Sequence, residues 1–211
     1  MPQIDVGIDE VGRGALAGPL VVGAVALSAE AVDRFVSDLL IAVQQKQLKD
    51  SKQLTSQQRE RIFEYISPYP IWSIGQAEAW EIDQLGLRKA ADLAAGRALD
   101  ALNISYDRVL ADAGLHHPYE ETIPTEFFIK GDERIPQIAL ASCMAKVTRD
   151  QIMHGLSARF ADYGCITNVG YGTAAHYAAL GRLGPSSEHR RLFLRKLVKK
   201  ATSGIPIAIS K

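Results

Sequence analysis

The sequence predicts an α/β protein in which helices flank a mixed β-sheet and the C-terminal part is helical. Runs with the two-residue period of strands alternate along the chain with longer runs that have the helical period of 3.6 residues. The first two strand-like runs lie close enough together to form a hairpin, and the end of the chain shows only helical patterns. No repeat or linker divides the 211 residues, so we expect one domain.

The strand predictions rest on the spacing of apolar residues. Ile4, Val6 and Ile8 alternate with other residues, as in a strand that buries one face. The run at residues 108–112 is apolar on both faces, as in a strand near the middle of a sheet. We expect strands at residues 4–8, 20–27, 71–77, 108–112 and 127–129.

The helix predictions rest on start signals and apolar periodicity. Thr55, followed three residues later by Gln58, fits a capping box that opens a short helix. Pro136 suits the first position of a long helix, because the N–H that it lacks would have no partner there. Gly86 interrupts a longer helical pattern. We expect helices at residues 29–43, 55–66, 82–102, 173–182 and 186–200, and a long helix from residue 136 whose packed face holds Ile138, Ala141, Ala145, Thr148 and Ile152.

Composition excludes some classes of protein. The 47% of apolar residues is ordinary for a globular protein and suffices for a core. No apolar run reaches the length of a membrane span, and the first residues lack the pattern of a secretory signal. Cys143 and Cys165 do not have metal-site spacing, so we expect reduced thiols in a cytoplasmic protein.

The zero net charge conceals an asymmetry along the chain. Seven basic residues and one acid lie between Arg182 and Lys200, which gives this segment a charge of +6 and the rest of the chain −6. An acidic body beside a basic arm suits a protein that holds a metal ion next to a polyanion.

Two adjacent acids, Asp9 and Glu10, precede a glycine-flanked arginine, Gly12-Arg13-Gly14. Crowded acids repel each other and need a cation, while glycines allow the backbone to approach a ligand closely. This pattern fits a divalent metal beside a phosphate backbone. Adjacent residues of a regular strand point to opposite faces, so both acids share a site only if the strand bends or Glu10 uses its backbone carbonyl.

Two further acids are placed like metal ligands. Asp112 ends a buried strand, where an unpaired charge is costly, and Asp150 lies on the long helix, one turn beyond Lys146. Together with Asp9 and Glu10 they could bind Mg²⁺ and support a phosphodiester displacement. The plainer alternatives are a turn residue for Asp112 and a helix ion pair for Asp150.

The glycines at positions 12, 14 and 18 also resemble a dinucleotide-binding turn. That motif requires a helix after the last glycine, whereas Gly18 is followed by Pro19 and a strand-like run. The acids before Gly12 would also repel a pyrophosphate, which argues against this alternative.

Several motifs follow one another in order along the chain. They are Asp9-Glu10-Val11-Gly12-Arg13-Gly14, Asp50-Ser51-Lys52, Lys130-Gly131-Asp132, Ala141-Ser142, Ala145-Lys146-Val147-Thr148-Arg149-Asp150, Gly170-Tyr171 and His189-Arg190-Arg191. Together they resemble ribonuclease HII, the bacterial type 2 ribonuclease H, from residue 4 to about residue 195. Arginine between the two glycines and the short leader differ from the type 3 enzymes.

The resemblance implies a ribonuclease H-like fold, with a core at about residues 1–165 and a helical extension at about residues 166–211. It implies a monomeric enzyme that uses Mg²⁺ or Mn²⁺, with two ions per site, to cut RNA in RNA–DNA hybrids. It also implies incision 5′ of single ribonucleotides in duplex DNA, and roles in ribonucleotide removal and primer degradation. A sliding-clamp partner is compatible with it, although no motif identifies one.

Carried over residue by residue, the resemblance implies a role for each site residue. The metal ligands would be Asp9, Glu10, Asp112 and Asp150. The ribose 2′-hydroxyl and nearby phosphates would be bound by Gly12, Arg13, Gly14, Ser51, Lys52, Lys146, Tyr171 and Arg191. His116, His117 and His189 are expected on the surface or in turns, because Mg²⁺ prefers oxygen ligands.

The chain departs from the family pattern at Ala113, Gly172 and Leu192. Gly172 replaces a proline that would stiffen the tyrosine loop, so the rigidity of that loop is in question. None of the three is an expected metal ligand. The alternative of a hybrid-binding module without cleavage is disfavoured, because all four acids are present.

Overall fold

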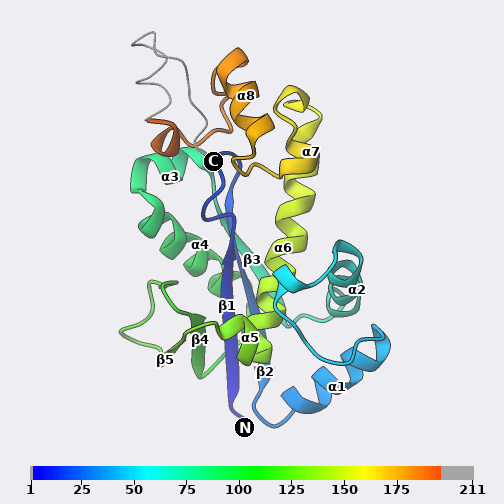
Figure 1. Cartoon of the computed structure of the whole chain (residues 1–211). Coiled ribbons are helices and arrows are strands. Elements are labelled where there is room, and N and C mark those ends of the chain that lie inside the picture. Colours follow the sequence, from blue (N-terminus) through cyan, green and yellow to red (C-terminus); the bar gives the residue numbers. More distant parts are fainter. Residues whose placement is uncertain (1, 196–211) are drawn as a thin grey trace.

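The computed structural model describes residues 2–195. Its centre is a five-stranded sheet in the order β3-β2-β1-β4-β5 (Figure 1). The strands are β1 (Ile4–Val11), β2 (Leu20–Ser28), β3 (Trp72–Ala77), β4 (Arg108–Asp112) and β5 (Thr125–Phe128). The helices are α1 (Val32–Ala42), α2 (Ser56–Ile66), α3 (Ala79–Leu85), α4 (Leu87–Ala101), α5 (Gly131–Arg134), α6 (Pro136–Ser157), α7 (Cys165–Asn168) and α8 (Ala174–Leu183), with 3₁₀ turns η1 (Ser51–Gln53) and η2 (Ala161–Tyr163).

The sheet is mixed because a hairpin is extended by parallel strands. β1 and β2 pair antiparallel, as do β2 and β3, whereas β1–β4 and β4–β5 are parallel. Parallel strands end at the same edge of a sheet. The C-terminal ends of β1, β4 and β5 therefore lie side by side. Asp9 and Glu10 lie near the end of β1, Asp112 is the last residue of β4, and Asp132 follows β5 on α5.

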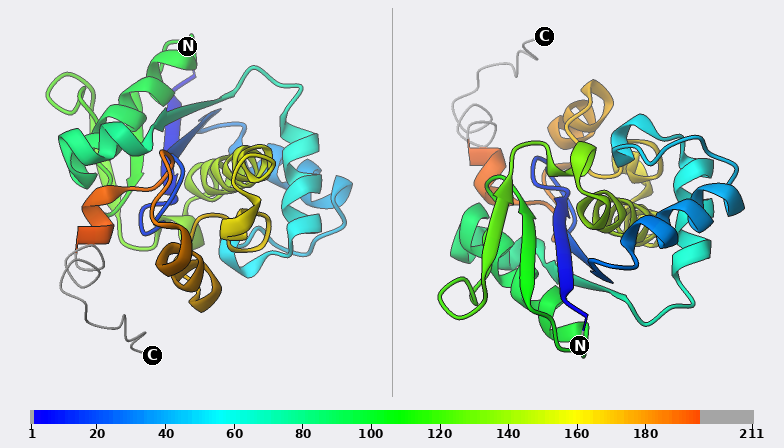
Figure 2. Two further views of the ribbon diagram at one scale, coloured as in Figure 1. Left: turned by 90° about the horizontal axis from the view of Figure 1, so that it is seen from above. Right: turned by 90° about the horizontal axis from the view of Figure 1, so that it is seen from below.

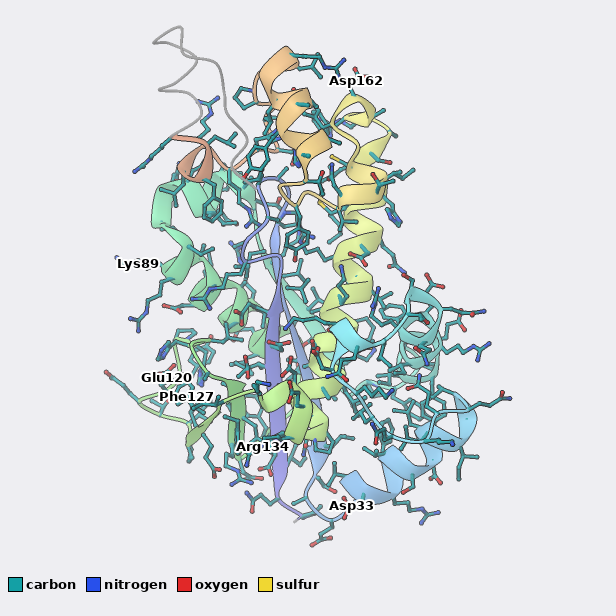
Figure 3. The ribbon with its side chains drawn as sticks, viewed as in Figure 1. Asp33, Lys89, Glu120, Phe127, Arg134 and Asp162 are labelled. Atoms are coloured by element: carbon teal, nitrogen blue, oxygen red, sulfur yellow. The ribbon has the colours of Figure 1, made fainter. Side chains whose placement is uncertain are left out.

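Each face of the sheet packs against helices (Figure 2). On one face, alternate residues of β1 such as Val6 and Ile8 pack with the alanine-rich side of α4. On the other face, Val25 and Leu27 of β2 form a second apolar cluster with α1, α2 and α6. The side chains fill the space between these layers, and Phe127 and Glu120 lie at the β5 side of the molecule (Figure 3).

Two glycines allow α6 to lie directly on the sheet. A Cβ at Gly7 of β1 would overlap the backbone of Gln137, and a Cβ at Gly23 of β2 would overlap the carbonyl oxygen of Ala141. The backbone of α6 therefore touches both strands. This contact fixes the position of α6 along the sheet, and with it the distance of each α6 side chain from the end of β1.

The structure confirms most of the expected elements. Thr55 forms the predicted capping box with Gln58, Pro136 begins α6, and Gly86 separates α3 from α4. Both cysteines are free. The single packed face expected for the long helix was too narrow, because residues 137–145 of α6 are all buried.

The C-terminal helix is described only in part. Residues 191–195 are helical, as predicted, but the expected start at residue 186 was wrong, because residues 186–190 form a turn and a β-bridge. The remainder of the predicted helix, including Lys196, Lys199 and Lys200, lies outside the described residues. No helix within residues 2–195 is both long enough and apolar enough to cross a membrane.

Candidate active site

The ends of the three parallel strands bring acids from distant parts of the chain together. The last β1–β4 pair is Ile8 with Ala111, so Asp9 and Asp112 occupy neighbouring positions one residue further along. Asp132 follows β5 on α5, and the Oδ1 atom of Asp112 accepts a hydrogen bond of 2.7 Å from the N–H of Gly131, next to Asp132.

The electrostatics show how strongly these acids interact. Asp9 is 5% exposed, and burial raises the pKa of its carboxyl to about 8. A hydrogen bond from Ser142 lowers this pKa, while the charges of Glu10, Asp112 and Asp132 raise it further. Asp9 is thus a buried acid surrounded by other acids, which is an arrangement that a bound cation stabilises.

Glu10 reaches the same cluster from the other side of the strand. Burial raises the pKa of its carboxyl, the hydrogen bond from Arg13 lowers it, and the charge of Asp112 raises it. Arg13 donates to Glu10 Oε1 over 2.9 Å and to the carbonyl oxygen of Gly114 over 3.4 Å. The opposite orientations of Asp9 and Glu10 therefore do not separate them electrostatically, because Asp112 interacts with both.

Asp132 is the acid that the sequence analysis missed as a ligand candidate. Its side chain is largely buried, burial and the charge of Asp50 raise the pKa of its carboxyl, and Lys52 lies 3.5 Å from its Oδ2 atom. The Lys130-Gly131-Asp132 motif was a usable signal, since an acid follows the end of a strand there as it does at Asp112.

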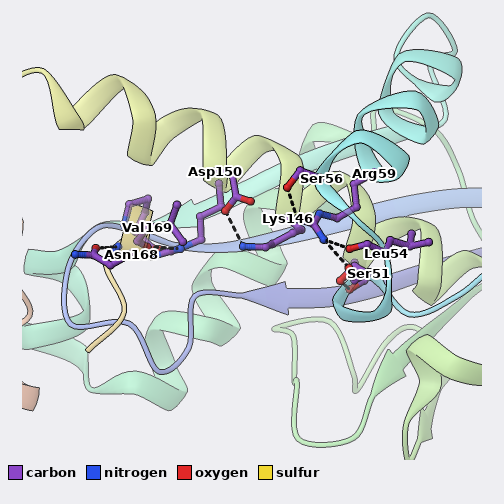
Figure 4. A network of polar contacts seen from close by, with 12 residues as sticks. Ser51, Leu54, Ser56, Arg59, Lys146, Asp150, Asn168 and Val169 are labelled. Atoms are coloured by element: carbon purple, nitrogen blue, oxygen red, sulfur yellow. Dashed lines mark hydrogen bonds and ion pairs between the residues drawn. The ribbon is translucent and has the colours of Figure 1, made fainter. Parts of the chain in front are cut away.

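Asp150 lies away from this cluster. Its Oδ1 atom accepts a hydrogen bond of 2.7 Å from Nζ of Lys146, one turn earlier on α6 (Figure 4). Ser142, which bonds Asp9, precedes Asp150 by eight residues, or about 12 Å along a helix. The ion pair considered for Asp150 is therefore present, and the role of Asp150 as a metal ligand stays a prediction.

Ser51 and Lys52 approach the cluster on η1. Ser51 and Ser142 share a buried hydrogen bond of 2.8 Å between their hydroxyl oxygens, which connects η1 to the partner of Asp9. Arg59 of α2 holds this loop by donating to the carbonyl oxygens of Ser51 and Leu54 (Figure 4). The side chain of Lys52 is mostly exposed, and its ammonium group faces the carboxylate of Asp132.

Two fully buried arginines hold the glycine loop through carbonyl oxygens. Arg149 donates to the carbonyls of Pro19, Ala17 and Val169, and Arg190 donates to those of Gly18, Gly12 and Arg13. A Cβ at Gly12, whose φ is +89°, would overlap the side chain of Arg149. Burial and the charge of Arg149 lower the pKa of Arg190 to about 9.

Tyr171 lies next to this loop. Its ring is 5.2 Å from the guanidinium of Arg149, and the carbonyl oxygen of the preceding Gly170 accepts hydrogen bonds from the N–H groups of Leu16 and Ala17. The side chain is half-buried. The loop with Tyr171 and the Gly12–Gly18 loop therefore form one hydrogen-bonded unit beside the acids.

The expectation that the three histidines lie on the surface or in turns was wrong for two of them. His189 is 2% exposed and bonds His176, and His117 is 4% exposed and bonds Thr125. Only His116 is partly exposed, beside Glu120. His189 is buried by contacts with Ala17 and His176, and His117 by contacts within its own loop, and neither set of contacts follows from the apolar spacing of the sequence.

Comparison with known proteins agrees with this arrangement. The family model for ribonuclease HII matches residues 6–199. The chain belongs to the ribonuclease HII family. A ribonuclease HII from Pelagibacter ubique is 41% identical over 191 residues, which cover 90% of this chain and 96% of that protein.

Solved structures show the same fold. The crystal structure of ribonuclease H2 from Pyrococcus horikoshii has a TM-score of 0.72 and 24% identity, with 94% of this chain and 98% of that one covered. Ribonuclease HII in a complex with PCNA from Archaeoglobus fulgidus has a TM-score of 0.70 and 26% identity, with 92% and 94% covered. The protein thus has a ribonuclease H-like α/β fold and is a metal-dependent ribonuclease H.

The donor set fits a hard divalent cation. Carboxylate oxygens are the ligands that Mg²⁺ and Mn²⁺ prefer, and Asp9 has only acids and a serine among its strongest neighbours. Within residues 2–195, no three His, Cys, Asp or Glu side chains are arranged so that they could hold a metal ion.

We expect Asp9→Asn to stabilise the metal-free protein at alkaline pH. An acid whose pKa rises on folding binds its proton more tightly in the folded state, so the free energy of unfolding falls as pH rises from about 4 through about 8. Asparagine removes this loss. Thermal unfolding in the presence of a chelator at pH 6 and pH 8.5 measures the effect, and the unfolding temperatures of wild type and variant should differ more at pH 8.5. A wild-type unfolding temperature that changes with pH no more than that of the variant would contradict the prediction.

Proposed function

We propose that the enzyme cuts the RNA strand of RNA–DNA hybrids and also incises 5′ of single ribonucleotides in duplex DNA, leaving 3′-hydroxyl and 5′-phosphate ends. The main support is the position of the acidic cluster directly beside the Gly12–Gly14 loop and Tyr171. Carboxylates suit a metal-assisted hydrolysis, and a glycine-lined loop suits a nucleic-acid backbone that approaches the main chain closely.

Asp9, Glu10, Asp112 and Asp132 would hold the metal ions. Divalent cations, Mg²⁺ or Mn²⁺ and two per site, would supply an activated water and stabilise the leaving oxygen. Hydrogen bonds orient two of these carboxylates: Ser142 bonds that of Asp9, and the backbone N–H of Gly131 bonds that of Asp112. Because Arg13 pairs with Glu10, it would have to exchange this partner for a phosphate when the site fills.

The same site would recognise the 2′-hydroxyl that distinguishes RNA from DNA. Main-chain groups of Gly12, Arg13 and Gly14 would bond it, and Tyr171 would contact the sugar. A site built to bond a hydroxyl rejects a substrate without one, because its polar groups are then left unpaired. Lys52 and Lys146 flank the acids, where they would contact phosphates.

A cleavage assay tests this proposal. Protein and Mg²⁺ or Mn²⁺ are incubated with three duplexes of one sequence: all-DNA, DNA with one ribonucleotide, and an RNA–DNA hybrid. We expect 5′ incision at the ribonucleotide, cleavage along the hybrid and none in DNA. Binding of the hybrid without any cleavage would indicate a binding module and would contradict the proposal.

The start of the C-terminal helix offers a surface for phosphates. The N–H groups of Arg191 and Leu192 donate to Asp83 of α3, which fixes this helix end, while the side chains of Arg191 and Arg195 are exposed. Residues four apart on a helix share a face. We propose that these arginines contact the backbone of the duplex.

Replacing both Arg191 and Arg195 by alanine should weaken binding to all duplex sequences alike. Each lost phosphate contact lowers the magnitude of the salt slope by about 0.9. The turnover at saturating substrate should change little. Arg34→Ala with Lys46→Ala removes the same charge near α1, at the far end of the molecule (Figure 1), and should leave the slope unchanged. Equal slopes for both double variants would show that this face only solubilises the helix.

We also propose a cytoplasmic role in ribonucleotide repair and in the removal of RNA primers during DNA replication. The structural relative from Archaeoglobus fulgidus was solved in a complex with PCNA. A comparable sliding-clamp contact of this protein would be consistent with that role, and a pull-down with a clamp protein tests it.

A further inference from the structure

Two buried histidines connect the Tyr171 loop to the C-terminal segment. The Nε2 atoms of His176 and His189 lie 2.9 Å apart, and neither side chain is more than 2% exposed. The Nδ1 atom of His176 lies 2.9 Å from the carbonyl oxygen of Tyr171. The Nδ1 atom of His189 lies 3.0 Å from the backbone nitrogen and 2.7 Å from the hydroxyl oxygen of Ser186.

The partners fix the direction of each hydrogen bond. A carbonyl oxygen only accepts, so Nδ1 of His176 carries a proton that it donates to Tyr171. A backbone N–H only donates, so Nδ1 of His189 accepts from Ser186 and its Nε2 carries the proton. His189 therefore donates to Nε2 of His176, and two neutral rings satisfy every bond in the series. Burial lowers the pKa of both histidines, to about 4 for His189, which favours this neutral state.

The loop that these histidines hold is strained. Val169, a β-branched residue, has a φ of 40°, and Gly170 has a φ of 84°. Such a conformation of a β-branched residue is energetically unfavourable and persists only where surrounding contacts enforce it. Gly172, at the position where the family pattern has a proline, adds no rigidity of its own. The carbonyl oxygen of Tyr171 accepts from the N–H of Thr173 and from His176, and His176 is the contact that links it to a segment outside the loop.

His189, at the other end of this chain of hydrogen bonds, is connected to the Gly12–Gly18 loop. His189 forms an isolated β-bridge with Ala17, and the next residue, Arg190, donates to the carbonyl oxygens of Gly12, Arg13 and Gly18. One short segment of the chain thus holds the glycine loop by Arg190 and the tyrosine loop by His189 and His176.

We propose that His176 and His189 are positioning residues for ribonucleotide recognition, which hold Tyr171 in register with the Gly12–Gly14 loop. This inference rests on the proposed function of the two loops. Neither histidine touches substrate. Without them, Tyr171 would sample other positions, and a substrate that offers a single 2′-hydroxyl would lose more than a hybrid that offers many.

His176→Phe tests the inference, because phenylalanine fills the site but donates no hydrogen bond. Loss of one hydrogen bond corresponds to about a five- to tenfold effect. We expect KM for duplex DNA with one ribonucleotide to rise by about that factor, KM for a long hybrid to rise less than about twofold, and kcat on both to change little. Kinetics are measured well below the unfolding temperature of each variant.

His176→Asn provides the rescue. The amide nitrogen of asparagine takes the place of Nδ1, so the bond to Tyr171 survives while the bond to His189 is lost. Because one of the two bonds is kept, we expect a KM for the single ribonucleotide between those of wild type and His176→Phe. A KM as high as that of His176→Phe would contradict a role for the bond to Tyr171. Ser73→Ala, which removes a buried hydrogen bond to Ala98 far from both loops, is the control for stability alone.

The outcomes separate the two levels of the proposal. Wild-type protein that does not incise a single ribonucleotide contradicts the proposed function. If wild type incises it and His176→Phe changes both KM values equally, or no more than Ser73→Ala does, the positioning role is overturned. If His176→Phe does not fold, Ser186→Ala replaces it, with the same substrate bias expected at about twofold in KM.

Discussion

Replacing Asp132 by asparagine should lower cleavage about a thousandfold while duplex binding survives. Asp132 is buried beside Asp9 and Asp112, and its charge is one of those that raise the pKa of Asp9. Loss of a carboxylate that holds the metal removes several kcal/mol of transition-state stabilisation, and each 1.36 kcal/mol is a factor of ten. Removal of a negative charge also lessens repulsion of phosphate. Turnover at saturating Mg²⁺ and the Kd for the hybrid measure the two effects.

Asp150→Asn is the matched comparison for this variant, since it makes the same change on α6. Asp150 pairs with Lys146, so its loss should cost about tenfold or less by releasing that lysine. Asp112→Asn should behave like Asp132→Asn. If Asp150→Asn is the inactive variant and Asp132→Asn turns over normally, the ligand set expected from the sequence holds and the one favoured by the geometry is wrong.

Tyr171→Ala should harm incision at a single ribonucleotide more than cleavage of a long hybrid. One ribonucleotide can fill the site in only one register, whereas a hybrid offers many registers and more backbone contacts. Loss of an aromatic contact to a nucleotide corresponds to about 1–3 kcal/mol, or about 5- to 150-fold in kcat/KM. The comparison of kcat/KM on the two substrates measures the difference.

Tyr171→Phe separates the ring from the hydroxyl in the same assay. The ring also stacks near Arg149, so alanine could disturb the loop, while phenylalanine preserves this contact. If phenylalanine behaves like wild type, the ring carries the recognition. If alanine reduces activity equally on both substrates, Tyr171 acts only as part of the structure.

The parts of the fold that could be predicted from sequence are those with local causes. The strand at residues 108–112 has the predicted limits, and the capping box at Thr55 depends on residues three apart. Asp112 could be proposed as a candidate ligand from sequence, because a charge at the end of a buried strand is costly unless it is paired. Asp132 could not, because it lies on a four-residue helix without periodicity and its place depends on the parallel register of β4 and β5.

The burial of His189 was equally hidden from local reasoning. Its surroundings come from Ala17 and His176, which approach it only in the folded chain. Arg190 is a similar case, because a basic residue in a basic segment is normally solvated, whereas here three carbonyl oxygens of a distant loop surround it. The Gly12–Gly18 loop and the loop with Tyr171 therefore depend on long-range contacts that residue spacing does not encode.

The contact of Arg190 with Gly12 also sets an order for biosynthesis. A ribosome makes Gly12, the strands and the four acids before Arg190, so these parts exist before Arg190 can support the glycine loop. The nascent chain would thus acquire its carboxylates early and its capacity to select a nucleotide late. A protein truncated before Ser186 would resemble that stage, with the acids in place and without the contacts of His189 and Arg190, while Arg149 and the carbonyl oxygen of Gly170 still join the two loops.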